Sequence, residues 1–123
     1  MSNISLTNRQ KLDLEKNIWI ATVRPDGRPH LVPVWFAWYD GRLFLCIERT
    51  SVKGRNLAAN PQLALALENG SQPVIIEGRA EVVPQPWPPG VLAIFKHKYD
   101  WDIATDGQYD QLIAVTPGRW LSL

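Results

Sequence analysis

Short hydrophobic runs rich in β-branched and aromatic residues recur along the chain, and turn-forming residues separate them. This pattern is typical of β-strands. The strands predicted in this way span residues 18–23, 30–38, 42–48, 62–68, 73–83 and 112–116, with a short seventh over 119–123. Because Asp40-Gly41 is a signal for a tight hairpin, residues 18–48 are predicted to form an antiparallel meander of three strands.

Three other segments carry helix signals. Thr7 is followed by Gln10 at the spacing of a capping box, and Ser51 is placed to cap a second helix. Pro88 can open a third helix because proline is tolerated in the first helical turn. The predicted helices span residues 7–16, 52–59 and 88–99.

Many short strands joined by tight turns, with a few small helices, indicate a mainly β protein. We expect a β-barrel of about six or seven antiparallel strands, since closing the sheet removes its exposed edges. The paired cysteines of an immunoglobulin-like sandwich are absent, because Cys46 is the only cysteine. A length of 123 residues predicts a single domain over residues 1–123.

Charge and hydropathy argue against two classes of binding partner, nucleic acid and membranes. The 13 Lys and Arg residues nearly balance the 12 Asp and Glu residues, so the net charge of +1 provides no footprint for nucleic acid or an anionic membrane surface. No apolar stretch approaches the roughly 20 residues of a membrane span, and the first residues lack the apolar core of a signal peptide. We therefore expect neither nucleic acid nor a membrane as a partner.

Cys46 lies in an apolar run and is expected to be a buried thiol that packs as a small hydrophobic group. A single cysteine allows no internal disulfide and no cysteine-rich metal site. His30 and His97 are not spaced as metal ligands either. We therefore expect a protein of the reducing cytoplasm without a metal site.

The most specific candidate site consists of Ser51, Lys53, Arg55 and Asn56, at the start of the predicted helix over 52–59. Cations are unfavourable at a helix N-terminus, which carries partial positive charge, unless an anion docks there. Free backbone N–H groups, a forked arginine, a lysine charge and a serine hydroxyl all suit a phosphate. Two cations that simply face water fit the same spacing equally well.

The run Trp35-Phe36-Ala37-Trp38-Tyr39 is the second candidate. In a strand, Trp35, Ala37 and Tyr39 would lie on one face and Phe36 and Trp38 on the other. Both faces would then be bulky, whereas the outer face of a one-sided strand is polar. The pattern predicts that a planar ligand or a second subunit covers the outer face, unless the strand is buried within the monomer.

Several of these residues occur in an order that resembles a known family. The segments DGRPHLVPVWF (26–36), Asp40-Gly41 and SVKGRNL (51–57) together resemble the pyridoxamine 5'-phosphate oxidase-like, FMN-binding split β-barrel family. The flavin/deazaflavin oxidoreductase branch is the most similar part of that family, and the similarity extends over about residues 17–116. The resemblance implies a split barrel that works as a homodimer, with two cofactor sites at the subunit interface.

The resemblance also implies a cofactor and its contacts. Many members of the family bind FMN, others bind the deazaflavin coenzyme, and a few bind haem. The residues that match the family's cofactor-phosphate segment are Ser51, Lys53, Arg55 and Asn56. The residues that match the strand alongside the isoalloxazine ring are Pro33, Val34, Trp35 and Phe36. The C-terminal substrate-binding segment of true pyridoxamine-phosphate oxidases has no counterpart here, so oxidation of vitamin B6 is not expected.

We therefore expect an oxidoreductase that transfers hydride through bound FMN, with a small-molecule substrate and a nicotinamide electron donor. A deazaflavin (F-420)-dependent reductase is the alternative, because the cations within residues 49–55 could meet that coenzyme's longer acidic tail. A non-catalytic flavin-binding or flavin-storage protein and a barrel without a ligand stay open. Arg24, His30 and Trp35 are candidates for shaping the site, residues 100–102 fit a solvated helix end or a pocket rim, and no catalytic residue is assigned.

Overall fold

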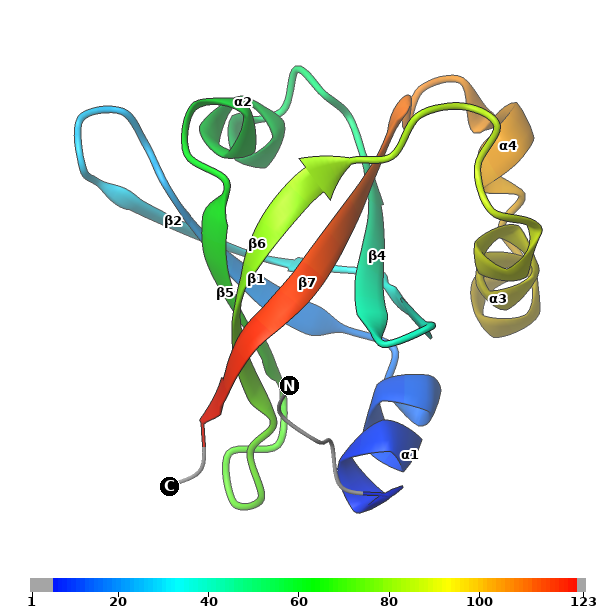
Figure 1. Cartoon of the computed structure of the whole chain (residues 1–123), viewed down its shortest axis with the longest axis horizontal. Helices are drawn as coiled ribbons and strands as arrows, with labels where there is room; N and C mark the ends of the chain where they lie inside the picture. Colours follow the sequence, from blue (N-terminus) through cyan, green and yellow to red (C-terminus); the bar gives the residue numbers. More distant parts are fainter. Residues whose placement is uncertain (1–5, 122–123) are drawn as a thin grey trace.

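The computed structural model describes residues 6–121, which form one curled antiparallel sheet with four helices around it (Figure 1). The strands are β1 (Ile18–Val23), β2 (Pro29–Val34), β3 (Ala37–Tyr39), β4 (Arg42–Ile47), β5 (Gln62–Leu67), β6 (Ile75–Val82) and β7 (Gln111–Leu121). The helices are α1 (Leu6–Leu14), α2 (Val52–Ala59), α3 (Pro89–Tyr99) and α4 (Ile103–Asp106). None of these helices is long and apolar enough to cross a membrane. The predicted mainly β split barrel is confirmed.

The order of the strands in the sheet is β2-β1-β5-β6-β7-β4-β3, so β2 and β3 are its two edges. Only Trp35 and Phe36 separate these edge strands in the sequence, and the sheet therefore curls until its two ends meet at this bend. The Phe36 N–H donates to the hydroxyl of Tyr99 at 3.1 Å instead of joining a strand ladder. The predicted single strand over 30–38 is therefore wrong, because the chain leaves one ladder and enters the other at the bend.

The bend also overturns the predicted alternation of faces between Trp35 and Tyr39. Phe36 and Ala37 are consecutive and both fully buried, whereas Trp35 is 46% exposed. Phe36 belongs to the core inside the barrel, and Ala37 belongs to a second core beside α3. Trp35 and Ala37 therefore have different surroundings, although the sequence pattern placed them on one face.

Two hydrophobic clusters hold these elements together. The larger one fills the barrel and includes Leu12 of α1. The second lies against α3 and α4 and includes Phe44 and Cys46 of β4 with Phe95 of α3. Alternate side chains of β4 enter different clusters, which explains why this strand is apolar and buried on both faces. Cys46 is a buried free thiol, as predicted.

Most of the predicted helices and strands occur with small shifts at their ends. β1 and α2 span the predicted residues, and the Ser51 side chain caps α2 as expected. Thr7 is not a cap, because α1 already begins at Leu6. The short helix α4 was not predicted, and the Asp102 carboxylate caps it by accepting the Ala104 N–H.

The two short strands predicted at 112–116 and 119–123 form one long strand, β7, which spans Gln111–Leu121. Residues 122–123 of the second prediction lie outside the described residues. Pro117 and Gly118 do not end it, because β7 stays paired with β6 across a β-bulge at Glu77/Gly78. A Cβ at Gly78 would lie 2.7 Å from the Thr116 carbonyl oxygen, so this close crossing requires glycine.

Candidate functional site

The loop before α2 packs tightly against the first turn of that helix. The Ser51 Oγ accepts the Gly54 N–H at 3.2 Å and donates to the Glu48 carbonyl at 2.6 Å. A Cβ at position 54 would lie 2.6 Å from the Arg49 carbonyl oxygen, so only glycine fits there. This packing fixes the direction in which the α2 N-terminus and its neighbour Lys53 point.

A cleft of about 460 Å³ lies beside the start of α2. Its walls come from five parts of the chain that are distant in sequence: the loop after α1, the end of β2 with the bend, β4, α2, and the region of α4. The lining residues are Asn17, Pro33, Val34, Trp35, Cys46, Lys53, Trp101, Asp106 and Tyr109.

Lys53 provides the cation of this cleft. Burial lowers the pKa of its ammonium, and the nearby Glu48 carboxylate partly opposes that change. Lys53 forms no ion pair within the part of the chain that the structure describes. A partly desolvated cation that forms no ion pair among the described residues, next to a helix N-terminus, suits a bound anion such as a phosphate.

Aromatic rings also line the cleft. Trp35 stacks on Tyr99 with ring centroids 4.6 Å apart and an interplanar angle of 7°. Trp101 meets Trp35 edge to face at 5.7 Å and Tyr109 edge to face at 5.3 Å. Packed rings beside an open space suit a planar, largely apolar ligand.

Asp106 places a negative charge at the aromatic end of the cleft. Its carboxylate accepts the Trp101 indole N–H at 2.8 Å and the Tyr109 backbone N–H at 3.1 Å, and these bonds lower its pKa. Burial, with Asp106 and Asp110 nearby, raises the pKa of the Cys46 thiol to about 12. The thiol is therefore protonated at neutral pH and is not a nucleophile.

Arg24 and His30 lie near Lys53 but outside the lining of the cleft. The pKa of His30 is lowered by burial first, and then by the charges of Arg24 and Lys53. Its imidazole is therefore neutral at pH 7. The His30 Nδ1 atom is buried without a hydrogen-bond partner among the described residues.

The structure brings together some of the predicted cofactor contacts and separates others. Pro33, Val34, Trp35 and Lys53 line the same cleft, although α2 and β2 are far apart in sequence. The Phe36 side chain lies in the barrel core, and Arg55 is exposed on α2 outside the lining. Asn56 is 3% exposed and donates to the Thr22 Oγ1 at 3.0 Å, which ties α2 to β1.

Sequence reasoning did not find Asn17, Asp106 and Tyr109 as lining residues. Nothing in their local pattern marks them, because only the packing of α4 against the sheet brings them to the cleft. Trp101 belongs to the segment 100–102, which fits a solvated helix end or a pocket rim, and it lines the cleft.

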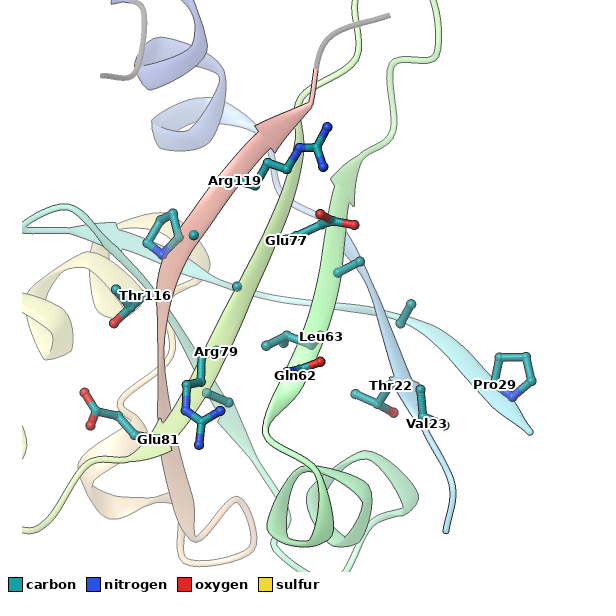
Figure 2. A pocket seen from close by; sticks show the side chains of 16 residues that line it. Thr22, Val23, Pro29, Gln62, Leu63, Glu77, Arg79, Glu81, Thr116 and Arg119 are labelled. Carbon is teal, nitrogen blue, oxygen red and sulfur yellow. The ribbon is translucent and has the colours of Figure 1, made fainter. Parts of the chain in front are cut away.

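A second, wider hollow of about 850 Å³ lies on the outer face of β1, β5, β6 and β7 (Figure 2). Small residues such as Ala64 and Gly78 form much of it, and no aromatic side chain lines it. Figure 2 shows the charged side chains Glu77, Arg79, Glu81 and Arg119 along its β6 and β7 side. This hollow, called the outer groove below, has neither the rings nor the desolvated cation of the cleft, so the cleft is the better ligand site.

The fold and the cleft define a split β-barrel with a helix N-terminus and a lysine beside a ring-lined cavity. The chain belongs to the pyridoxamine 5'-phosphate oxidase family, whose profile matches residues 8–122. The predicted family is confirmed. None of the curated proteins matches the chain.

Solved structures with the same fold cover nearly the whole chain. An F420 reductase shares 28% sequence identity, with a TM-score of 0.75 over 92% of this chain and 94% of that chain. HutZ, the heme storage protein from Vibrio cholerae, shares 20% identity, with a TM-score of 0.77 over 96% and 92%. An FAD-binding protein from Mesorhizobium loti shares 19%, with a TM-score of 0.68 over 95% and 90%. The last two similarities establish the fold alone.

Proposed function

We propose that the cleft binds a phosphorylated flavin-type cofactor, FMN or its deazaflavin counterpart, and that the protein is an oxidoreductase that transfers hydride through it. The observation that carries this proposal is the meeting of Lys53 with Pro33, Val34 and Trp35 in one cleft. Membership of the family and the 28% identity with an F420 reductase support the same class of ligand.

Each part of the site has a separate task in this proposal. Lys53 holds the phosphate, with Ser51 and Arg55 at the same end of α2, while Asn56 keeps that helix on the barrel. Pro33, Val34 and Trp35 lie along the ring. A bound flavin-type cofactor supplies hydride transfer, whereas the chain supplies position, electrostatics and exclusion of water. The buried thiol of Cys46 takes no chemical part.

The cations around the site favour the deazaflavin coenzyme over FMN as the cofactor. Arg24 and Arg55 form no ion pair among residues 6–121; Arg24 and Lys53 both act on His30, and Arg55 follows Lys53 on α2. A longer acidic tail would use these cations, whereas FMN ends at a single phosphate. Competition between FMN and the deazaflavin coenzyme for one protein sample decides between the two.

We also propose that the protein is a homodimer with its two cofactor sites at the subunit interface, and that the outer groove forms part of the contact surface. Arg79 and Arg119 lie in this groove together with Glu77, whereas Glu81 already pairs with Arg42 at 3.2 Å. Two copies related by a two-fold axis can therefore pair Glu77 with these arginines. The small side chains beneath them allow close approach of the two sheets. A nicotinamide coenzyme as electron donor, a small-molecule substrate and a cytoplasmic location complete the proposal.

The proposal is tested by cofactor retention followed by turnover. A protein that retains FMN or the deazaflavin coenzyme, and then oxidises an added nicotinamide coenzyme, is an enzyme of the proposed class. Retention without any turnover across donors would point to a storage protein, and absence of retention would contradict the proposal as a whole.

A further inference from the structure

The last turn of α3 holds the bend between β2 and β3 through two side chains. The Tyr99 hydroxyl accepts the Phe36 N–H at 3.1 Å and lies 2.8 Å from the Lys16 carbonyl oxygen, to which it can donate. The Lys98 ammonium donates to the Phe36 carbonyl at 3.3 Å and to the Leu12 carbonyl at 3.2 Å. Both ends of the Phe36 residue, and the end of α1, are therefore tied to one turn of α3.

The ring of Tyr99 also contacts Trp35, the residue before Phe36. Trp35 is 46% exposed and sits at a bend, so without a partner its indole would adopt several orientations. The nearly parallel stack on Tyr99 at 4.6 Å covers one face of the indole, and Trp101 meets it edge on. Tyr99 itself does not line the cleft, whereas Trp35 does.

We propose that Tyr99 is a positioning residue of the cofactor cleft: it fixes the plane of the Trp35 indole against which a planar ring is held. This inference rests on the proposed function, because it concerns the same cleft. Tyr99 makes no contact with the ligand and acts only through Trp35. Removing its ring should therefore loosen the cleft without removing any group that touches the ligand.

The test is a double-mutant cycle on cofactor affinity with Trp35→Leu, Tyr99→Leu and the double variant, using FMN or the deazaflavin coenzyme, whichever the wild type retains. We expect each single variant to bind roughly three- to tenfold more weakly. The double variant should bind no more weakly than Trp35→Leu, because Tyr99 has no effect once the indole is gone. Losses that multiply, or wild-type affinity in Tyr99→Leu, would overturn the inference.

Two further variants separate positioning from general damage to the fold. Tyr99→Phe keeps the ring stack and loses the hydroxyl, so it should retain affinity within about twofold of the wild type. His97→Leu changes an exposed residue on the same turn of α3 and should have no effect. A loss in Tyr99→Phe as large as that in Tyr99→Leu would assign the effect to the hydroxyl and reject positioning through the ring.

A readout without cofactor keeps this test separate from the proposed function. The stacked Trp35 and Tyr99 rings should give a near-ultraviolet circular dichroism band in the ligand-free protein. Tyr99→Leu should remove the band that Trp35→Leu removes, and the double variant should remove no more. If the wild type retains no cofactor, the proposed function fails; if the band persists in Tyr99→Leu, the positioning of Trp35 by Tyr99 fails.

Discussion

At the scale of single residues, the helical geometry of α2 decides which predicted contacts can share one cleft. Consecutive residues of a helix are about 100° apart around its axis, so Lys53 and Arg55 point in nearly opposite directions, about 160° apart. Lys53 turns to the cleft and Arg55 to solvent. Asn56 faces the barrel and binds Thr22. The sequence motif groups these residues, but the structure gives them separate tasks.

Replacing Lys53 with alanine should lower the affinity for FMN or the deazaflavin coenzyme by roughly 10- to 150-fold. A charge-assisted phosphate contact contributes about 1.5–3 kcal/mol, which corresponds to this range. Isothermal titration or flavin fluorescence measures the change. The free energy of unfolding should change little, because Lys53 forms no ion pair in the described part of the chain.

Arg9→Ala is the matched control, since it removes an exposed cation from α1, at the opposite end of the barrel from α2 (Figure 1). It should bind as the wild type does. Equal affinities in Lys53→Ala, Arg9→Ala and the wild type would remove Lys53 from the phosphate site.

At the scale of the elements, hydrophobic patterns predicted most strands and helices because each carries its own local signals. The Asp40-Gly41 hairpin, the Ser51 cap and the proline at the start of α3 are such signals. The bend at Trp35 could not be predicted in this way. There the Phe36 N–H leaves the sheet and is satisfied by Tyr99, which lies 63 positions later in the sequence and has no local signal for this contact.

The partly buried Lys98 ammonium, which donates to the Phe36 and Leu12 carbonyls from the end of α3, also predicts a pH effect on stability. Burial, and then the Lys16 charge, lower the pKa of Lys98 from 10.5 to about 8, against the opposing effect of Asp13 and Glu15. Tyr99, whose pKa is raised to about 12 by burial, stays protonated over this range. Between pH 8 and 10.5 the folded state has lost the Lys98 proton that the unfolded state still holds, so the free energy of unfolding gains a term that rises with pH.

We therefore expect wild-type protein to gain stability relative to Lys98→Met as the pH rises from about 8 to 10.5. The lysine is partly exposed, so solvent reduces the size of the gain. Urea unfolding of both proteins at several pH values measures the difference in their free energies of unfolding. The contributions of the other titrating groups cancel in this difference. Parallel stability curves for the two proteins would contradict the role given to Lys98.

At the scale of the whole molecule, the split barrel and its family could be predicted from the sequence because turn signals and three short motifs keep their order. The shape of the cleft could not be predicted from the sequence. Asn17, Asp106 and Tyr109 meet there only after α4 and the end of α1 pack beside the sheet. The outer groove has no sequence signal either, since small residues such as Ala64 serve equally well in a strand interior.

The proposed dimer predicts that Ala64→Arg weakens self-association by roughly tenfold or more. The introduced arginine would place its guanidinium in the outer groove, where dimer formation would remove its hydration without offering a carboxylate to pair with it. Sedimentation velocity over a range of concentrations measures the change. Ala93→Arg, on an exposed position of α3, is the control and should leave the dimer intact. A monomeric wild type, or an unaffected Ala64→Arg dimer, would contradict this use of the groove.

The central claim, that the cleft holds a flavin-type cofactor by its phosphate, is tested most directly by the visible absorption spectrum. The purified protein is mixed with excess FMN, or in a parallel sample with the deazaflavin coenzyme, and then freed of unbound material. We predict that the wild type retains one of the two at about one molecule per chain and that Lys53→Ala retains far less. A folded wild type that retains neither would contradict the account.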